Sequence, residues 1–179
     1  MREPLDRNKL TRFLEALGAA ATGPGVVFLT GGATAVAHGW RSQTIDIDLR
    51  LDPEPAGAFD AIAKLKETLD VNVELASPAD FLPPVPGWRD RSIFVGHFGA
   101  IDVYHFDLVS QTLAKLARGF TRDHFDADAM VASGLVDASA VESGFAAIRP
   151  GLVRFPRLDE PAFAQRVAQF IARHLGVPP

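Results

Sequence analysis

The most constraining feature of this sequence is the stretch from residue 26 to residue 51. It opens with an apolar run over residues 26–29, which is typical of a buried strand. Two glycines follow, and residues 33–40 contain enough alanine to form a helix. Residues 44–51 then alternate aliphatic with charged side chains, which is the period of a strand with one buried face. A strand–helix–strand unit of this kind predicts a mixed α/β fold.

The rest of the 179-residue chain extends this pattern. We expect an α/β (α+β) fold in which a mixed sheet flanked by helices occupies residues 1–106. A helical bundle over residues 107–179 follows and packs on that core, because no Gly/Ser linker marks the boundary. The further helices expected are 5–18, 52–69, 108–118, 122–133, 137–148 and 160–175; the further strands are 71–75 and a hairpin of 91–97 and 100–106.

Composition excludes several classes of protein. The chain has no cysteine, which rules out disulfides, thiol catalysis and cysteine-bound zinc or iron–sulfur clusters. Its 18 basic and 22 acidic residues give a net charge of −4, which does not favour a protein that coats nucleic acid. A membrane span needs about 20 apolar residues, and neither such a run nor an apolar signal segment near MREPLDRNKL is present. We therefore expect a cytoplasmic protein with no membrane partner.

The candidate functional residues lie in the same stretch, residues 26–51, that predicts the fold. Asp46 and Asp48 are two residues apart on an expected strand, so their carboxylates point the same way. Such a pair suits Mg²⁺ or Mn²⁺, which take hard oxygen ligands together with substrate phosphates. Gly31 and Gly32, at the strand-to-helix junction, allow a phosphate to approach the backbone. The alternative is that the two aspartates mark the solvent face of an edge strand.

A glycine pair followed by Asp-x-Asp on the next strand resembles the DNA polymerase β-like nucleotidyltransferase superfamily. Over residues 26–130 the chain is more closely similar to small bacterial nucleotidyltransferases related to AbiE-type toxins. The resemblance implies that Gly31 and Gly32 contact the nucleotide triphosphate and that Asp46 and Asp48 bind the catalytic metals. It also implies a third carboxylate from a neighbouring strand.

Glu74 is the best match for that third carboxylate and metal ligand, and Asp102 in the later hairpin is the alternative. The family often has serine at or after the second glycine, where this chain has Ala33 and then Thr34. A hydroxyl contact to phosphate would therefore come from Thr34 or Thr30. Arg41 and Thr44 match positions that are often Arg or Ser/Thr in the family, which implies that they steady the aspartates; the alternative is that they simply end a helix and start a strand.

A second motif lies in residues 113–126. If the helix continues through Gly119, its basic residues and Asp126 share one face. The motif is similar to a Lys…Arg-Asp-x-x-Asp element of the AbiE-like group. The resemblance implies that Lys115 and Arg122 contact nucleotide phosphates and that Asp123 and Asp126 support the site. The alternative is a solvated helix face with Arg122 and Asp126 paired.

Together these features predict an enzyme, a magnesium-dependent nucleotidyltransferase. It would transfer a nucleoside monophosphate from an NTP to an acceptor hydroxyl of RNA, such as tRNA, or of a protein. The resemblance further implies the toxin of a toxin–antitoxin system, with an antitoxin as partner. The alternative is a catalytically degenerate nucleotide- or partner-binding module that retains the fold.

Overall fold

A computed structural model of the chain describes residues 3–176, which divide into two compact units. Unit 1 contains the described residues up to Ser77 together with Ile93–Phe106, and unit 2 contains Pro78–Ser92 and the chain from Asp107 onward. The expectation of one continuous core over residues 1–106 is therefore wrong for residues 78–92. The reason is that the apolar residues of this segment pack in the helical unit, where Val85 lies beside Gly144.

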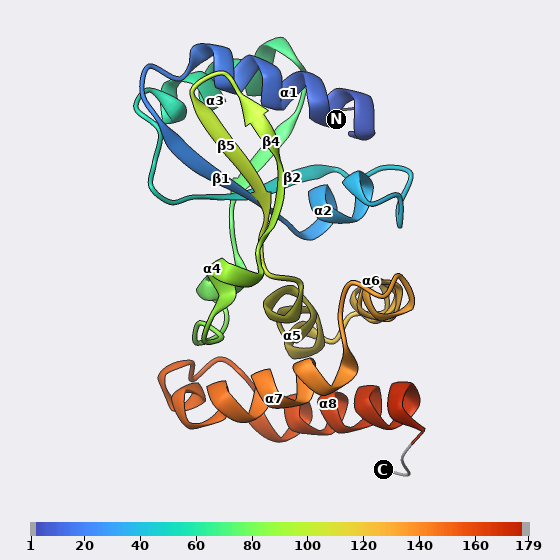
Figure 1. Cartoon of the computed structure of the whole chain (residues 1–179). Helices are drawn as coiled ribbons and strands as arrows, with labels where there is room; N and C mark the ends of the chain where they lie inside the picture. Colours follow the sequence, from blue (N-terminus) through green and yellow to red (C-terminus); the bar gives the residue numbers. More distant parts are fainter. Residues whose placement is uncertain (1–2, 177–179) are drawn as a thin grey trace. The chain divides into compact units, whose positions relative to one another are not determined.

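Unit 1 is a five-stranded mixed sheet with helices (Figure 1), which confirms the α/β class expected from the sequence. The strand order is β3-β2-β1-β5-β4, with β1 antiparallel to β2 and parallel to β5, and β2 parallel to β3. The last two strands form an antiparallel hairpin. The elements of unit 1 are α1 (Arg7–Ala20), β1 (Gly25–Thr30), α2 (Gly31–Ala37), β2 (Asp46–Leu51), α3 (Ala58–Thr68), β3 (Asn72–Leu75), β4 (Ile93–Phe98) and β5 (Ile101–His105).

The two faces of this sheet differ in chemistry. Alternate residues of the central strands, among them Leu29, Leu49 and Val103, are fully buried in one apolar cluster. Helix α1 adds Phe13 and Leu17 to the same cluster, and Figure 1 shows α1 and α3 lying along the sheet. Because side chains alternate across a strand, the charged residues of β2 are left on the opposite face.

Helix α3 begins later than the sequence suggests. We expected it to open at residue 52, but it begins at Ala58, after Gly57 with φ +78°. Backbone hydrogen bonds explain the difference: the Asp52 N–H donates to the Val26 carbonyl, and the Val26 N–H donates to the Pro53 carbonyl. Residues 52–53 are therefore held against β1, and the helix starts only beyond the second proline of this segment.

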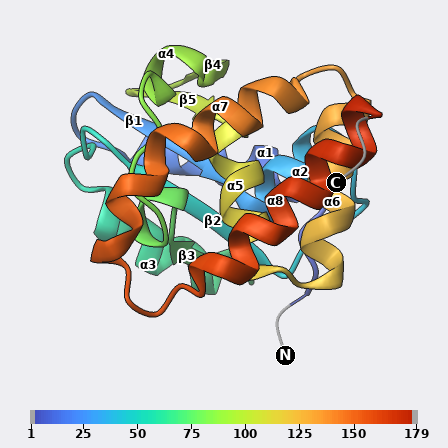
Figure 2. The same ribbon diagram turned by 90° about the horizontal axis from the view of Figure 1, so that it is seen from below.

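Unit 2 is helical. Figures 1 and 2 show α7 and α8 running beside each other, and the rings of Phe145 and Phe163 meet edge-on between them with centroids 4.9 Å apart. The Asp107 carboxylate caps α5 through the N–H groups of Val109 and Ser110, and it also pairs with Arg91 at 2.8 Å. The elements are η1 (Pro78–Asp80), α4 (Trp88–Arg91), α5 (Leu108–Arg118), α6 (Thr121–Ala132), α7 (Ala138–Ile148), η2 (Arg149–Arg154) and α8 (Glu160–Leu175), where η denotes a 3₁₀ helix.

Among residues 3–176, no helix has both the length and the apolar character needed to cross a membrane.

Candidate functional site

Asp46 and Asp48 lie on the polar face of β2. They are two residues apart, so their side chains leave the strand on the same side, whereas Ile47 between them is fully buried in the core. Strand β2 has β1 on one side and β3 on the other. The alternative that these aspartates mark an edge strand is therefore wrong.

Glu74 lies directly opposite Asp48. Strands β2 and β3 pair in parallel with Asp46 opposite Asn72 and Asp48 opposite Glu74. Neighbouring strands are about 4.8 Å apart, and residues opposite each other have their side chains on the same face. The register therefore brings three carboxylates, those of Asp46, Asp48 and Glu74, to one face of two adjacent strands.

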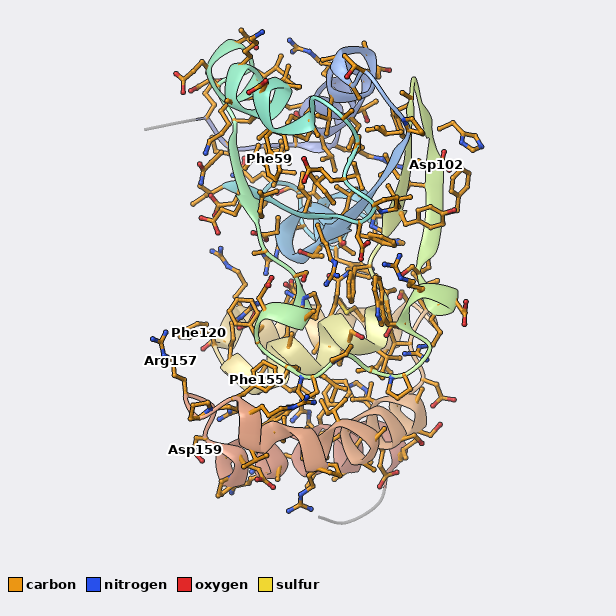
Figure 3. The ribbon with its side chains drawn as sticks, turned by 90° about the vertical axis from the view of Figure 1, so that its left-hand side faces the viewer. Phe59, Asp102, Phe120, Phe155, Arg157 and Asp159 are labelled. Atoms are coloured by element: carbon orange, nitrogen blue, oxygen red, sulfur yellow. The ribbon has the colours of Figure 1, made fainter. Side chains whose placement is uncertain are left out.

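Asp102 lies elsewhere in the sheet. It is opposite Val26 at the start of β1, whereas Asp48 is opposite Thr30 at the end of β1. Those four residues along β1 correspond to about 13 Å. The Asp102 carboxylate instead contacts His97 Nδ1 at 2.5 Å, and Figure 3 labels Asp102 at the β4–β5 hairpin. The register thus excludes Asp102 as a ligand shared with Asp48.

The aspartate side chains of β2 point to different neighbours. Asp46 Oδ1 accepts a hydrogen bond from Asn72 Nδ2 at 2.5 Å, and Asp48 Oδ2 accepts one from the Gly32 N–H at 3.3 Å. Within residues 3–176, no three His, Asp or Glu side chains form a group that could hold a metal ion. The structure therefore brings the three carboxylates to one face without a closed three-ligand set.

Gly31 and Gly32 allow Asp48 and Thr44 to pack closely against the junction of β1 and α2. A Cβ on Gly31, whose φ is +55°, would lie 2.2 Å from Asp48 Oδ2, and one on Gly32 would lie 2.1 Å from Thr44 Oγ1. Real Cβ atoms do not approach other atoms this closely, so both glycines are needed for this packing alone. Thr44 itself is fixed by two backbone hydrogen bonds with Leu5, and it holds the start of β2 beside the glycine pair.

Arg41 lies in the segment between α2 and β2, with a half-buried side chain. Its N–H donates to the Ala35 carbonyl at the end of α2.

The two threonines considered for phosphate contact face the interior. Thr34 is fully buried, and its hydroxyl donates to the Leu29 carbonyl at 3.1 Å. The hydroxyl of Thr30 donates to the Ala76 carbonyl at 3.0 Å. The expectation that Thr34 contacts a phosphate is wrong for this structure, because α2 turns that side chain towards β1 and β5.

Two neighbouring histidines, the buried His105 and the half-buried His38, lie close to Thr34. His105 Nδ1 is 3.2 Å from the Thr34 hydroxyl, and its ring centroid is 4.3 Å from that of His38. Burial, with a smaller contribution from His38, lowers the pKa of His105 to about 3. Burial also lowers the pKa of His38, with a smaller effect of Arg7. His105 is therefore neutral at physiological pH, because burial disfavours its charged form.

The second motif does not form one helical face. Helix α5 ends at Arg118, Gly119 has φ +73°, and α6 begins at Thr121. A left-handed residue at this position ends a helix, so the expected continuation through Gly119 is wrong.

Lys115, expected to contact phosphate, is held inside unit 2 instead. Its ammonium is 2.5 Å from Asp126 Oδ2 and 3.7 Å from Asp123 Oδ1, and only 3% of Lys115 is exposed. Arg118 makes two hydrogen bonds to Asp123. Burial raises the pKa of Asp123, but the hydrogen bond and charge of Arg118 and the charge of Lys115 outweigh it, so the pKa is lowered. These contacts join α5 to α6. The motif therefore has a structural role in this fold, which corrects the expectation that Lys115 contacts a nucleotide phosphate.

Arg122 is exposed at the start of α6. Within residues 3–176 it has no ion-pair partner, so the alternative pairing with Asp126 is not formed. Asp126 forms an ion pair with Lys115 instead.

Asn72 lies beside the carboxylates, although the sequence did not mark it as a candidate site residue. Its amide binds Asp46, and the signal that could have found it is the strand pairing, in which Asn72 and Glu74 occupy the same face of β3.

No protein-family model, curated protein or solved structure matches this chain. The resemblance to nucleotidyltransferases therefore rests on the motifs and on the geometry described above, and it stays a prediction.

Proposed function

We propose that this chain is a nucleotidyltransferase of the DNA polymerase β-like superfamily. It transfers a nucleoside monophosphate from an NTP to an acceptor hydroxyl and releases pyrophosphate. The oxygen of the acceptor forms a bond to the α-phosphorus, the bond from that phosphorus to the β-phosphate bridge breaks, and the hydroxyl proton leaves to a base.

One observation carries this proposal: Asp46, Asp48 and Glu74 share a face of β2 and β3 beside the Gly31–Gly32 junction. Carboxylates on one face of adjacent strands favour a cation between them and substrate phosphates. We take Glu74 rather than Asp102 as the third carboxylate; the register that places Glu74 opposite Asp48 supports this choice.

The donor set fits Mg²⁺ or Mn²⁺. These ions accept one or two carboxylates and complete their shell with substrate phosphates and water, so Asp46 and Asp48 would hold the metal without a third protein ligand. When bound, the metal supplies charge neutralisation at the phosphates. Glu74 is exposed, and we assign it the acceptor side, where it takes up the proton of the attacking hydroxyl.

The acceptor proposed is RNA, such as tRNA, or a protein hydroxyl, and an antitoxin is the proposed partner if the chain acts as a toxin. A second candidate function is a degenerate binding module that kept the fold. It is favoured by Lys115, whose ammonium is engaged by two aspartates in unit 2 rather than free for a phosphate.

The test is transfer of label from each α-³²P NTP to total RNA or protein in the presence of Mg²⁺. We expect transfer by the native chain, loss of label when the ³²P is in the γ position, and loss of activity in EDTA. Asp46→Asn, Asp48→Asn and Glu74→Gln should each reduce transfer by at least about 100-fold, because each removes charge from the reacting centre.

Asp102→Asn is the matched control. It removes one carboxylate from the same sheet, but Asp102 is on β5, opposite Val26 at the start of β1 and away from Asp48. Transfer should therefore be unchanged. Mg²⁺-dependent NTP binding without transfer would favour the binding module. Absence of Mg²⁺-dependent NTP binding in the folded native chain would reject both functions.

A further inference from the structure

Unit 2 contains a cavity of about 570 Å³ that belongs to this unit alone. It is lined by η1 and the residue after it, by the end of α5, and by the segment that joins η2 to α8. Its volume lies in the range of small-molecule sites, about 300 to 1,000 Å³. None of the carboxylates on β2 or β3 contributes to it.

Three guanidinium groups line this cavity, those of Arg118, Arg154 and Arg157, against one carboxylate, Asp80. Arg118 is oriented by two hydrogen bonds to Asp123. Arg154 and Arg157 are exposed, and within residues 3–176 neither has an ion-pair partner. An excess of guanidinium groups, with two of them available, is the chemistry that binds phosphate.

The remaining lining is apolar and partly aromatic. Phe81 and Phe155 contribute rings, and Pro156 and Leu158 contribute aliphatic surface. Phe81 is 42% exposed, and the Arg118 guanidinium lies 6.0 Å from the centre of its ring. Figure 3 shows the Phe155 and Arg157 side chains at the same edge of the helical unit. An aromatic surface next to arginines suits a flat base attached to a phosphate.

We propose that this cavity binds a nucleotide, with Arg154 and Arg157 on its phosphate and Phe155 and Phe81 against its base. Two sources share this chemistry, a free nucleoside monophosphate and a nucleotide within single-stranded RNA. The proposal does not rest on the transfer reaction, because the residues involved are separate from Asp46, Asp48 and Glu74.

The experiment measures binding to the full chain carrying Asp46→Asn and Asp48→Asn, in EDTA, so that metal-dependent binding at the carboxylates is removed. The probes are AMP, UMP and inorganic phosphate by calorimetry and a fluorescein-labelled single-stranded oligoribonucleotide by anisotropy. We expect saturable binding of at least one probe, weakened by salt. Arg154→Gln/Arg157→Gln should weaken it by at least about tenfold, since two charge-assisted contacts are lost.

Arg149→Gln/Arg173→Gln is the matched control. It removes the same charge from exposed ion pairs with Glu160 and Asp128, outside the cavity, and it should leave binding within about twofold. Phe155→Leu should weaken binding of AMP and of the oligonucleotide but not that of inorganic phosphate, because only the stacking surface is lost.

The probe that binds identifies the source: binding of the monophosphates indicates a free nucleotide, and binding of the oligonucleotide alone indicates an RNA strand. The proposal is overturned if no probe binds, or if the cavity variant and the control variant bind equally. Circular dichroism of each variant ensures that a loss of binding is not a loss of fold.

Discussion

At the scale of single residues, several side chains that sequence reasoning assigned to the substrate are engaged inside the protein. Thr34 donates to the Leu29 carbonyl, and Lys115 is bound by Asp126. Packing explains the two glycines, because a side chain at position 31 would collide with Asp48 and one at position 32 with Thr44. The carboxylates on β2 and β3 lie on the polar face of the sheet, and they remain the candidate residues for the proposed reaction.

The buried histidine predicts how stability depends on pH. The pKa of His105 is about 3 in the folded chain, against its ordinary value of 6.5. Between these values the unfolded chain binds a proton that the folded chain does not, so stability is fully present above pH 6.5 and is lost as the pH falls towards 3. From pH 7 to pH 5 we expect a loss of roughly 2 kcal/mol from this group, measured by urea unfolding.

His105→Gln is the variant that checks this assignment, since glutamine keeps a polar group near the Thr34 hydroxyl and does not titrate. Its stability should change less between pH 7 and pH 5 than that of the native chain. The lowered pKa of His38 acts in the same direction, so part of the slope should remain. An unchanged slope would contradict the role of His105.

At the scale of elements, ion pairs carry the connection between α5 and α6. Lys115 on α5 contacts Asp126 and Asp123 on α6, and Arg118 adds two hydrogen bonds to Asp123. Because Gly119 ends α5, α5 and α6 are separate helices. The ion pairs between them fix the position of one helix against the other.

This connection predicts the effect of removing Lys115. Lys115→Met should destabilise the protein by about 3–5 kcal/mol, because it leaves Asp126 buried without its cation. Lys115→Met/Asp126→Leu should recover most of that loss, since both charges are removed together. Thermal and urea unfolding of the two variants measure this. A phosphate-binding role would instead give weaker NTP binding with little change in stability.

Sequence reasoning predicted the elements better than their contacts. The alternation on β2 and the apolar stripe of α1 are local, and both elements form where expected. The choice between Glu74 and Asp102 depends on strand order and register, which join residues far apart in the chain and leave no local signal. The break at Gly119 and the late start of α3 depend on left-handed glycines, whose conformation the sequence allows but does not require.

At the scale of the whole molecule, the chain passes between the two units three times, after Ser77, after Ser92 and after Phe106. The helical unit therefore lacks part of its core if it is cut at residue 107. Leu82 and Val85 are buried, and Arg91 binds the residue that caps α5.

A fragment of residues 107–179 should accordingly fold poorly, with reduced helicity and no cooperative unfolding transition. Residues 78–92 joined to 107–179 by a short Gly/Ser linker should restore both, because Arg91 and Asp107 already lie within hydrogen-bond distance and the linker need span little. Circular dichroism with urea titration compares the two. Equal stability of both fragments would show that residues 78–92 are not part of the helical core.

The sheet order also has a consequence for the newly made chain. Strand β1 lies in the middle of the sheet, and its partner on one side, β5, comes from Ile101–His105. Until those residues leave the ribosome, one edge of an apolar strand stays without its backbone partners, the kind of edge that pairs with other chains. Nascent chains stalled before residue 101 are thus expected to need chaperone protection, and release from it should coincide with emergence of the hairpin.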